Sequence, residues 1–278
     1  MLSQLGEDAK LLAGGQSLIP LMKLRLAQPS DLVDLNFISG LDSIEGSGQE
    51  IVLGALARHQ DVADSEACAQ VPILTDCASG IADFQVRNRG TVAGSLAEAD
   101  PGGDWTPVLL TLGAQLHCLG PHGSRMIALS DFVEDAYATV LQPAEVIRRV
   151  RIPIPPQGSG GAYLAFKRSA QVYATASAAV QLQLKEETYR EVRIALGCVG
   201  LTAIRATQAE GFLSGKEATA ENLASAAEAA AEEAQPVSDV KGSAAYKKTL
   251  LRALVRRAAE RAVRRARGEQ LEGGHEYV

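Results

Sequence analysis

The sequence predicts an α+β fold in two unequal domains. Of its 278 residues, the first 156 alternate short apolar runs with turns, whereas the rest carry longer strand-like runs followed by two helices. Between them lies the segment QGSGG at residues 157–161, whose small residues indicate a linker. We therefore expect one domain over residues 1–156 and a second over residues 162–278.

The elements of the first domain are all predicted to be short. Apolar runs bounded by Asp, Gly and Ser predict strands over AKLLA, residues 32–35 and residues 51–53. Helices are expected around residues 60–67, 72–84 and 105–112. The segment AQLHCLGPHGSRMIAL predicts a β-hairpin around its Gly-Pro-His-Gly turn, and EVIRRVRIP predicts a strand that ends at prolines.

The second domain is predicted to contain three strand-like runs and then two helices. The runs are AYLAFKRS, TASAAVQLQL and EVRIALGCVG, and the helices lie near residues 220–234 and 243–267. Ser243 can cap the start of the last helix, and Gly268 its end. One face of this helix is apolar, formed by Tyr246, Leu250, Leu251, Leu254, Val255, Ala258 and Ala262. Its outer face is predicted to be basic, either solvated or docked to an acidic partner, and carries Lys247, Lys248, Arg252, Arg256, Arg257, Arg261, Arg264, Arg265 and Arg267.

Composition excludes several functional classes. A net charge of −6 and an aromatic content of 4% argue against general binding of nucleic acid or anionic lipid. No apolar run has the length of a membrane span or a signal peptide, so we expect a cytoplasmic protein. The four cysteines are far apart and form no C-x-x-C pair, which argues against a zinc ribbon or cysteine-ligated cluster built by this chain alone and favours buried, reduced thiols.

Two segments of small residues stand out as candidate binding loops. Ala13-Gly14-Gly15-Gln16-Ser17 follows the first strand, and Thr91-Val92-Ala93-Gly94-Ser95 precedes a helix. Each could be a tight turn that serves packing alone, or a nest of backbone amides that binds a phosphate. Two such loops followed by a carboxylate, Asp104, fit a diphosphate joined to a hydroxyl-bearing chain. Neither the G-x-G-x-x-G fingerprint nor the P-loop is present, so the scaffold for such a ligand is a different one.

The segments AGGQSLIPLMKLRLAQPSDLVDL and RNRGTVAGSLAEADPGGD carry a resemblance to a known family. In this order and spacing they resemble the medium, FAD-binding subunit of molybdenum hydroxylases, the carbon monoxide dehydrogenase and xanthine dehydrogenase family. The likeness continues through EVIRRVRIP, AFKRSAQVYATASAAV and SDVKGSAAYKKTLLRALVRRA. It implies a two-subdomain FAD-binding fold of vanillyl-alcohol-oxidase (PCMH) type, split near residue 50, and a small α+β C-terminal domain. The family usually has a short strand and most of a helix before LGEDAKLLAGG, and we expect this lead-in to be missing here.

The resemblance also implies which residues bind the cofactor. Ala13 to Ser17 and Thr91 to Ser95 match the two pyrophosphate loops, and Asp104 matches the acid that holds the sugar-like chain of the flavin. Ile147 matches a backbone contact near the ring, Lys167 a nearby basic residue, and Tyr173 an aromatic residue beside the isoalloxazine.

The function that the resemblance implies is electron transfer within a larger enzyme. The chain would carry FAD in a heterotrimeric molybdenum hydroxylase and take electrons from the [2Fe-2S] clusters of a small partner subunit. A large partner subunit would hold molybdopterin and the substrate, and the assembly would be a dimer of heterotrimers. No catalytic acid–base pair is expected on this chain.

The sequence departs from the family pattern at two positions in or beside the second loop. Ala93 replaces the first glycine of T-I-G-G-N or T-I-G-G-S, and its methyl group is tolerated only if the residue keeps a negative φ. Glu98 stands where many relatives have histidine.

Other interpretations of the same residues remain. The chain could be a self-sufficient FAD-dependent oxidase or a non-enzymatic scaffold, and Gly15-Gln16-Ser17 is an incomplete nucleophile elbow of a serine hydrolase. His117, Cys118 and His122 could bind a metal but fit surface residues of the hairpin better. Two arginines, Arg87 and Arg89, could face phosphate or pair with surface acids.

Overall fold

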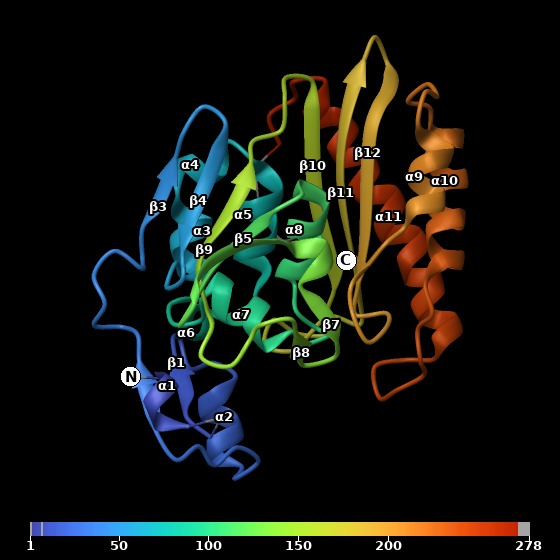
Figure 1. Ribbon diagram of the computed structural model, residues 1–278. Helices are drawn as coiled ribbons and strands as arrows, with labels where there is room; N and C mark the ends of the chain where they lie inside the picture. Colours follow the sequence, from blue (N-terminus) through green and yellow to red (C-terminus); the bar gives the residue numbers. More distant parts are fainter. Residues whose placement is uncertain (1, 7, 272–278) are drawn as a thin grey trace.

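The computed structural model describes residues 2–6 and 8–271 of the chain. Its strands form a five-stranded sheet and a four-stranded sheet, with a small N-terminal lobe at the lower end of the molecule (Figure 1). The predicted α+β class is confirmed. Within the part of the chain that the structure describes, no helix combines the length and the apolar character that a membrane crossing requires.

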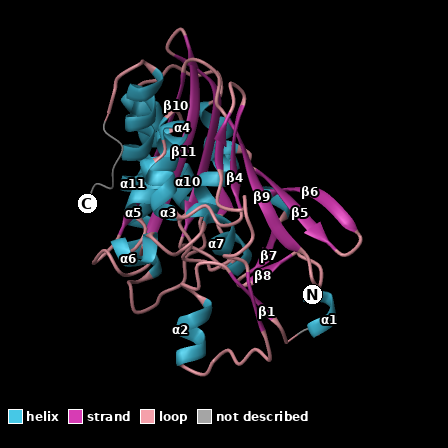
Figure 2. Ribbon diagram, turned by 90° about the vertical axis from the view of Figure 1, so that its left-hand side faces the viewer, coloured by secondary structure: helices cyan, strands magenta, loops and turns pink. Residues whose placement is uncertain are grey.

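The N-terminal lobe is built from four short elements. Helix α1 (Leu2–Leu5) precedes two parallel strands, β1 (Lys10–Leu12) and β2 (Leu32–Asp34), and helix α2 (Leu18–Lys23) connects the strands. The structure describes all of α2, and none of its residues is buried. Figure 2 shows this lobe projecting from the base of the molecule.

An antiparallel five-stranded sheet forms the centre of the first domain. Its order is β3 (Ile44–Gly46), β4 (Glu50–Gly54), β9 (Val146–Pro153), β5 (Gln115–Gly120) and β6 (Gly123–Ala128). Strand β9 returns late in the sequence and inserts between β4 and β5, so the predicted hairpin and the predicted EVIRRVRIP strand are both confirmed. The remaining elements are α3 (His59–Asp64), α4 (Glu66–Ala69), α5 (Pro72–Gly80), α6 (Phe84–Arg87), α7 (Val92–Glu98), α8 (Trp105–Leu112), the 3-10 helix η1 (Leu129–Asp131), β7 (Val133–Asp135) and β8 (Ala138–Thr139).

The C-terminal sheet is buried on both faces. It runs β10 (Ser159–Phe166), β11 (Ala176–Lys185), β12 (Thr188–Gly197) and β13 (Ile204–Arg205), followed by α9 (Thr207–Leu213), α10 (Ala220–Glu233) and α11 (Ala244–Ala266). Ala178 and Val180 pack into one apolar core with α11, whereas Ala179 packs into the core of the first domain. Helices α5 and α8 contact that second face. Burial on both faces explains why the three strand-like runs are apolar over most of their length.

The glycines of QGSGG have a packing role that the linker prediction missed. Ser159 to Gly161 lie inside β10, and only Gln157 and Gly158 form a turn. A Cβ on Gly160 would overlap the backbone of α11, and a Cβ on Gly161 would overlap the side-chain amide of Gln181. The glycines therefore let β10 approach its neighbours closely, and they do not provide a flexible joint.

Helix α11 has the predicted caps but a less basic outer face than predicted. The Ser243 hydroxyl accepts a hydrogen bond from the Tyr246 N–H at 3.1 Å, and Gly268 follows the helix with a φ of +88°. Lys247 and Arg265 are buried, contrary to prediction, because their long side chains reach back to carbonyl and carboxylate oxygens of other segments. Tyr246, predicted on the apolar face, is exposed.

A buried ion pair joins α5 of the first domain to α11. The Asp76 carboxylate accepts two hydrogen bonds from the Arg265 guanidinium, at 2.6 and 2.9 Å. The Tyr163 N–H also donates to Asp76, at 3.3 Å, and Arg265 donates to the Gly161 carbonyl. This cluster therefore connects helix α5 of the first domain to strand β10 and helix α11 of the second.

The cysteines are free thiols. Cys68, Cys77 and Cys118 are buried as expected, whereas Cys198 is only partly buried. No group of His, Cys, Asp and Glu among the described residues could hold a metal ion. The hairpin does not bring His117, Cys118 and His122 into a ligand set, and Cys118 lies in the core instead of at the surface.

Candidate functional site

The first predicted loop forms a turn with unpaired backbone amides. Gly15 has a φ of +73°, in the left-handed region that favours glycine. The carbonyl of Ala13 accepts a hydrogen bond from the Asn36 side chain at 2.9 Å, which fixes the loop against the end of β2. The N–H groups of residues 14–17 have no acceptor among the described residues. Four neighbouring unpaired donors form a cradle suited to an anion.

The second predicted loop is the first turn of helix α7. Thr91 caps the helix, and its hydroxyl accepts a hydrogen bond from the Gly94 N–H at 3.1 Å. Ala93 is helical and is not among the residues with positive φ, so its methyl group is accommodated without backbone strain. Val92 points into the hydrophobic core, and its N–H donates to the Ala57 carbonyl. The free end of α7 adds the positive end of a helix to the site.

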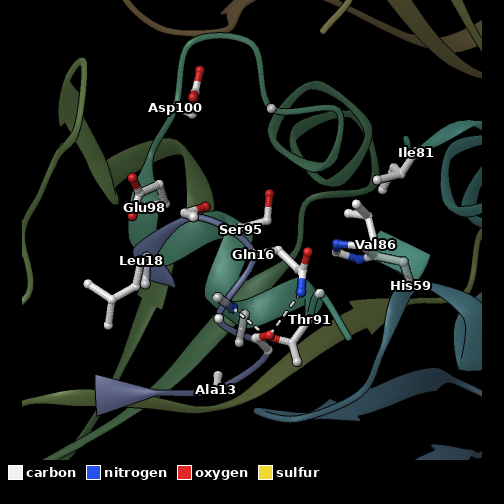
Figure 3. A pocket seen from close by; sticks show the side chains of 18 of the residues that line it. Ala13, Gln16, Leu18, His59, Ile81, Val86, Thr91, Ser95, Glu98 and Asp100 are labelled. Atoms are coloured by element: carbon white, nitrogen blue, oxygen red, sulfur yellow. Dashed lines mark hydrogen bonds between the residues drawn. The ribbon is translucent and has the colours of Figure 1, made fainter. Parts of the chain in front are cut away.

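The two loops touch each other and open into one cavity. A Cβ on Gly14 would overlap the backbone of Arg89 and Gly90, just before Thr91. A Cβ on Gly94 would lie 4.0 Å from the Cβ of Ala13. Both loops line the same cavity of about 440 Å³, which Figure 3 shows between the Ala13 segment and helix α7. That volume falls in the range of small-molecule and cofactor sites.

The structure brings together every predicted site residue except Val92. The cavity is lined by Ala13, Gly14, Gly15, Gln16, Ser17, Thr91, Ala93, Gly94, Ser95, Asp104, Ile147, Lys167 and Tyr173.

Asp104 is held in a buried polar network at the cavity wall. Its carboxylate accepts a hydrogen bond from the Tyr163 hydroxyl at 2.5 Å and another from the Lys167 ammonium at 3.2 Å. Lys167 also donates to the Gly80 carbonyl at 2.8 Å. Burial, and then the Asp104 charge, raise the pKa of Tyr163 well above its usual range, so this phenol stays a donor. The network fixes the direction in which Asp104 faces the cavity.

Tyr173 lies at the cavity mouth and is half-exposed. Its ring packs against Gly102, where a Cβ would lie 2.9 Å from the ring carbon Cγ. The ammonium of Lys241 lies 5.7 Å from the ring centroid and donates to the Ala174 carbonyl. These contacts hold a half-exposed aromatic ring at the cavity lining.

The contacts place two charged residues that the sequence singled out. Arg87 does not face the cavity, because its guanidinium donates to the side chain of Gln60 and to the carbonyls of Ile81 and Ala82. Glu98 does line the cavity, and its pKa is raised by burial and by the nearby Asp100 carboxylate.

Sequence reasoning missed His59, which lines the cavity and is 5% exposed. The indole N–H of Trp105 donates a hydrogen bond to its Nδ1 atom at 3.0 Å. Burial lowers the pKa of His59 to about 4. His59 is remote from both loops in sequence, and a lone histidine after a strand forms no motif. The one signal is the chain's single tryptophan, because a buried indole N–H needs a hydrogen-bond acceptor.

Among residues 2–6 and 8–271, Ser17 has no partner that would activate it as a nucleophile. Its hydroxyl forms no hydrogen bond with any histidine among the described residues. The hydrolase interpretation therefore lacks a base in place.

Two family models match the two halves of the chain. The FAD binding domain in molybdopterin dehydrogenase matches residues 1–155, and the CO dehydrogenase flavoprotein C-terminal domain matches residues 161–262. Together with the fold and the amide-lined cavity, they define an FAD-binding flavoprotein of the oxidoreductase class.

Individual relatives narrow the class to a family. The carbon monoxide dehydrogenase medium chain of Hydrogenophaga pseudoflava is 40% identical, over 93% of this chain and 90% of the relative. The 6-hydroxypseudooxynicotine dehydrogenase complex subunit alpha of Paenarthrobacter nicotinovorans is also 40% identical, over 96% of this chain and 91% of the relative. Among solved structures, reconstituted CO dehydrogenase from Oligotropha carboxidovorans aligns with a TM-score of 0.91 and 40% identity, over 95% of this chain and 93% of the other. The chain belongs to the FAD-binding medium subunits of molybdopterin hydroxylases, the family of the carbon monoxide dehydrogenase medium chain.

Proposed function

We propose that this chain is the electron-transfer subunit of a heterotrimeric molybdenum hydroxylase. In this proposal the chain holds FAD and passes electrons from the [2Fe-2S] clusters of a small subunit to an external acceptor. A large subunit with molybdopterin hydroxylates the substrate, and two heterotrimers form the assembly. The observation that carries the proposal is the pair of touching loops that line one cavity, the first of them with four backbone N–H groups that have no acceptor among the described residues.

The residues at the cavity fit the diphosphate and the sugar-like chain of FAD. The unpaired N–H groups of residues 14–17 would hold the diphosphate, since they present backbone donors without obstructing side chains. The first turn of α7 would border the diphosphate with small residues and the positive end of the helix; its Val92, Gly94 and Ser95 N–H groups already donate to Ala57 and Thr91. Asp104 would accept hydrogen bonds from the hydroxyls of the flavin chain, because Tyr163 and Lys167 already fix its carboxylate. A Cβ at Gly14 would close the junction of the two loops, so the cradle depends on its glycines.

When bound, FAD supplies redox chemistry that accepts and releases electrons singly or in pairs. The protein's part is to place and shield the cofactor. Tyr173 would cover part of the ring at the cavity mouth, and the buried Lys167 brings a positive charge to the wall that also carries Asp104. No residue of this chain is assigned to proton abstraction or covalent catalysis.

Exposed apolar side chains on the N-terminal lobe support a role within an assembly. Leu24, Leu26, Phe37 and Ile38 are all at least half-exposed, and they lie close together in the sequence around α2 and the end of β2. Apolar groups gathered in this way commonly mark a protein interface. We assign this lobe to contact with a partner subunit.

Reconstitution of the complex tests this function. We expect the purified chain to bind FAD and to keep it oxidised when substrate alone is added. The visible flavin absorbance should bleach only when both partner subunits and their substrate are present. Bleaching by a small organic substrate without partners would contradict the proposal and favour a self-sufficient oxidase; a chain that refuses FAD altogether would favour a scaffold.

A further inference from the structure

His59 is a buried polar side chain that faces the cavity wall. It is the first residue of α3, and its backbone N–H donates to the Gly90 carbonyl at 3.0 Å. In Figure 3 the imidazole points from the side of Ile81 and Val86 toward the middle of the cavity. The backbone of His59 is thus fixed by a hydrogen bond, and its side chain is directed into the cavity.

The hydrogen bond from Trp105 sets the tautomer of His59. An indole N–H can only donate, so the Nδ1 atom of His59 must accept and cannot carry a proton. The proton of the neutral ring therefore lies on Nε2. If Nδ1 were protonated as well, its N–H would point at the indole N–H of Trp105, and two donors would face each other.

No described residue accepts a hydrogen bond from this Nε2–H group. The atom is nevertheless not sealed in the core, because it lies at the surface of the cavity. Gly90 keeps it uncovered: a Cβ there would lie 2.7 Å from Nε2. A buried donor without an acceptor costs free energy, so this group is expected to find its partner in the ligand.

The position of the donor is at the junction of the two loops. The same Gly90 packs against Gly14, where a Cβ would lie 2.8 Å from the Gly90 Cα. Trp105 is adjacent in sequence to Asp104, so the histidine also adjoins the polar network of the cavity wall.

We propose that His59 is a binding residue of this cavity and donates a hydrogen bond from Nε2 to an acceptor atom of the bound flavin nucleotide. The inference rests on the proposed FAD binding and deepens it. Trp105 acts as a positioning residue, since it touches His59 and fixes where the proton lies. The acceptor belongs either to the ADP half of FAD or to the flavin half, and titration with ADP separates the two.

Two substitutions separate the binding role of His59 from its structural role. His59→Asn keeps an acceptor oxygen near the Nδ1 position for Trp105 but removes the donor at Nε2. His59→Gln can place an amide N–H near the Nε2 position and retains the donor. We expect His59→Asn to weaken FAD binding about tenfold and His59→Gln to stay within about threefold of wild type.

The readouts are FAD affinity by flavin fluorescence and the histidine ¹⁵N spectrum of the full chain. The spectrum should show an Nε2–H tautomer for His59 before FAD is added and a shift of that signal afterwards. Titration with ADP locates the acceptor: a parallel loss of ADP affinity in His59→Asn places it on the ADP half, and unchanged ADP affinity places it on the flavin half.

Two results would overturn the inference while leaving FAD binding intact. One is wild-type FAD affinity in His59→Asn, and the other is an unshifted His59 signal in the FAD-loaded protein. Failure of the wild-type chain to bind FAD would instead overturn the proposed function, together with this role for His59.

Discussion

His59 shows how one buried side chain couples the site to stability. Burial is the main cause of its low pKa of about 4, against an ordinary value of 6.5; the Asp104 carboxylate opposes this shift and the Arg87 charge adds to it. Between these two values the unfolded chain binds a proton that the folded chain does not. Stability is therefore expected to rise with pH across this window and to fall as the pH drops below 6.5.

This linkage predicts a pH-dependent loss of stability that depends on His59. From pH 7.5 to pH 5 the histidine alone should cost about 2 kcal/mol of unfolding free energy. Urea unfolding of wild type and His59→Gln at both pH values measures the difference, because the variant has no titrating group at this position. An equal loss in both proteins would show that His59 is not buried in its neutral form.

The residue scale is also where sequence reasoning was weakest. The two loops and Asp104 carry a recognisable pattern of small residues followed by an acid. His59 and Tyr163 carry none, because their roles depend on contacts with residues more than forty positions away. The prediction that Lys247 and Arg265 lie on the outer face fails for a related reason, since helical spacing cannot show which long side chains reach buried oxygens.

At the scale of elements, the last helix with its cap and the β5–β6 hairpin are confirmed, because their caps and turns are local. The helices expected around residues 60–67 and 72–84 are each divided in two, into α3 and α4 and into α5 and α6. Ser243, the Gly-Pro-His-Gly turn and the alternating runs beside it act within a few residues. The packing role of the QGSGG glycines is not visible in the sequence, because Gly160 and Gly161 contact α11 and Gln181, which are distant in sequence. The second loop proved to be a helix end, a distinction that a run of small residues does not reveal.

The contact between the two loops predicts a specific effect of Gly14→Ala. The added Cβ would overlap the backbone of Arg89 and Gly90, so the loops must separate and the amides of residues 14–17 must move. We expect at least tenfold weaker FAD binding, measured by fluorescence titration. Gly48→Ala is the matched control, since it adds the same methyl group in open space at a residue without positive φ. Equal affinity in the two variants would contradict the assigned cradle.

At the scale of the whole molecule, the two domains share one apolar core and one buried ion pair. Tyr163, Ala165 and Ala179 of the C-terminal sheet belong to the core of the first domain. Asp76 and Arg265 connect the same parts through hydrogen bonds. Asp104 of the first domain and Lys167 of the second meet at the cavity, so the site needs both domains in their observed arrangement.

Removal of one partner of this ion pair should destabilise the whole chain. Asp76→Ala leaves the Arg265 guanidinium buried beside Arg261 without its carboxylate, and we expect a loss of about 3–5 kcal/mol in unfolding free energy. Glu50→Gln, which breaks the exposed pair with Arg151, should have little effect. Chemical unfolding monitored by circular dichroism measures the unfolding free energies of the two variants and of wild type. Similar small losses in both variants would mean that the buried pair does not hold the domains together.

The most direct test of the central claim is an equilibrium titration of the flavin-free chain with FAD. The touching loops, the free amides and the single cavity predict saturable binding of one FAD per chain, competed by ADP because the diphosphate is held by backbone donors. Absence of saturable binding by the folded wild-type chain would contradict the account.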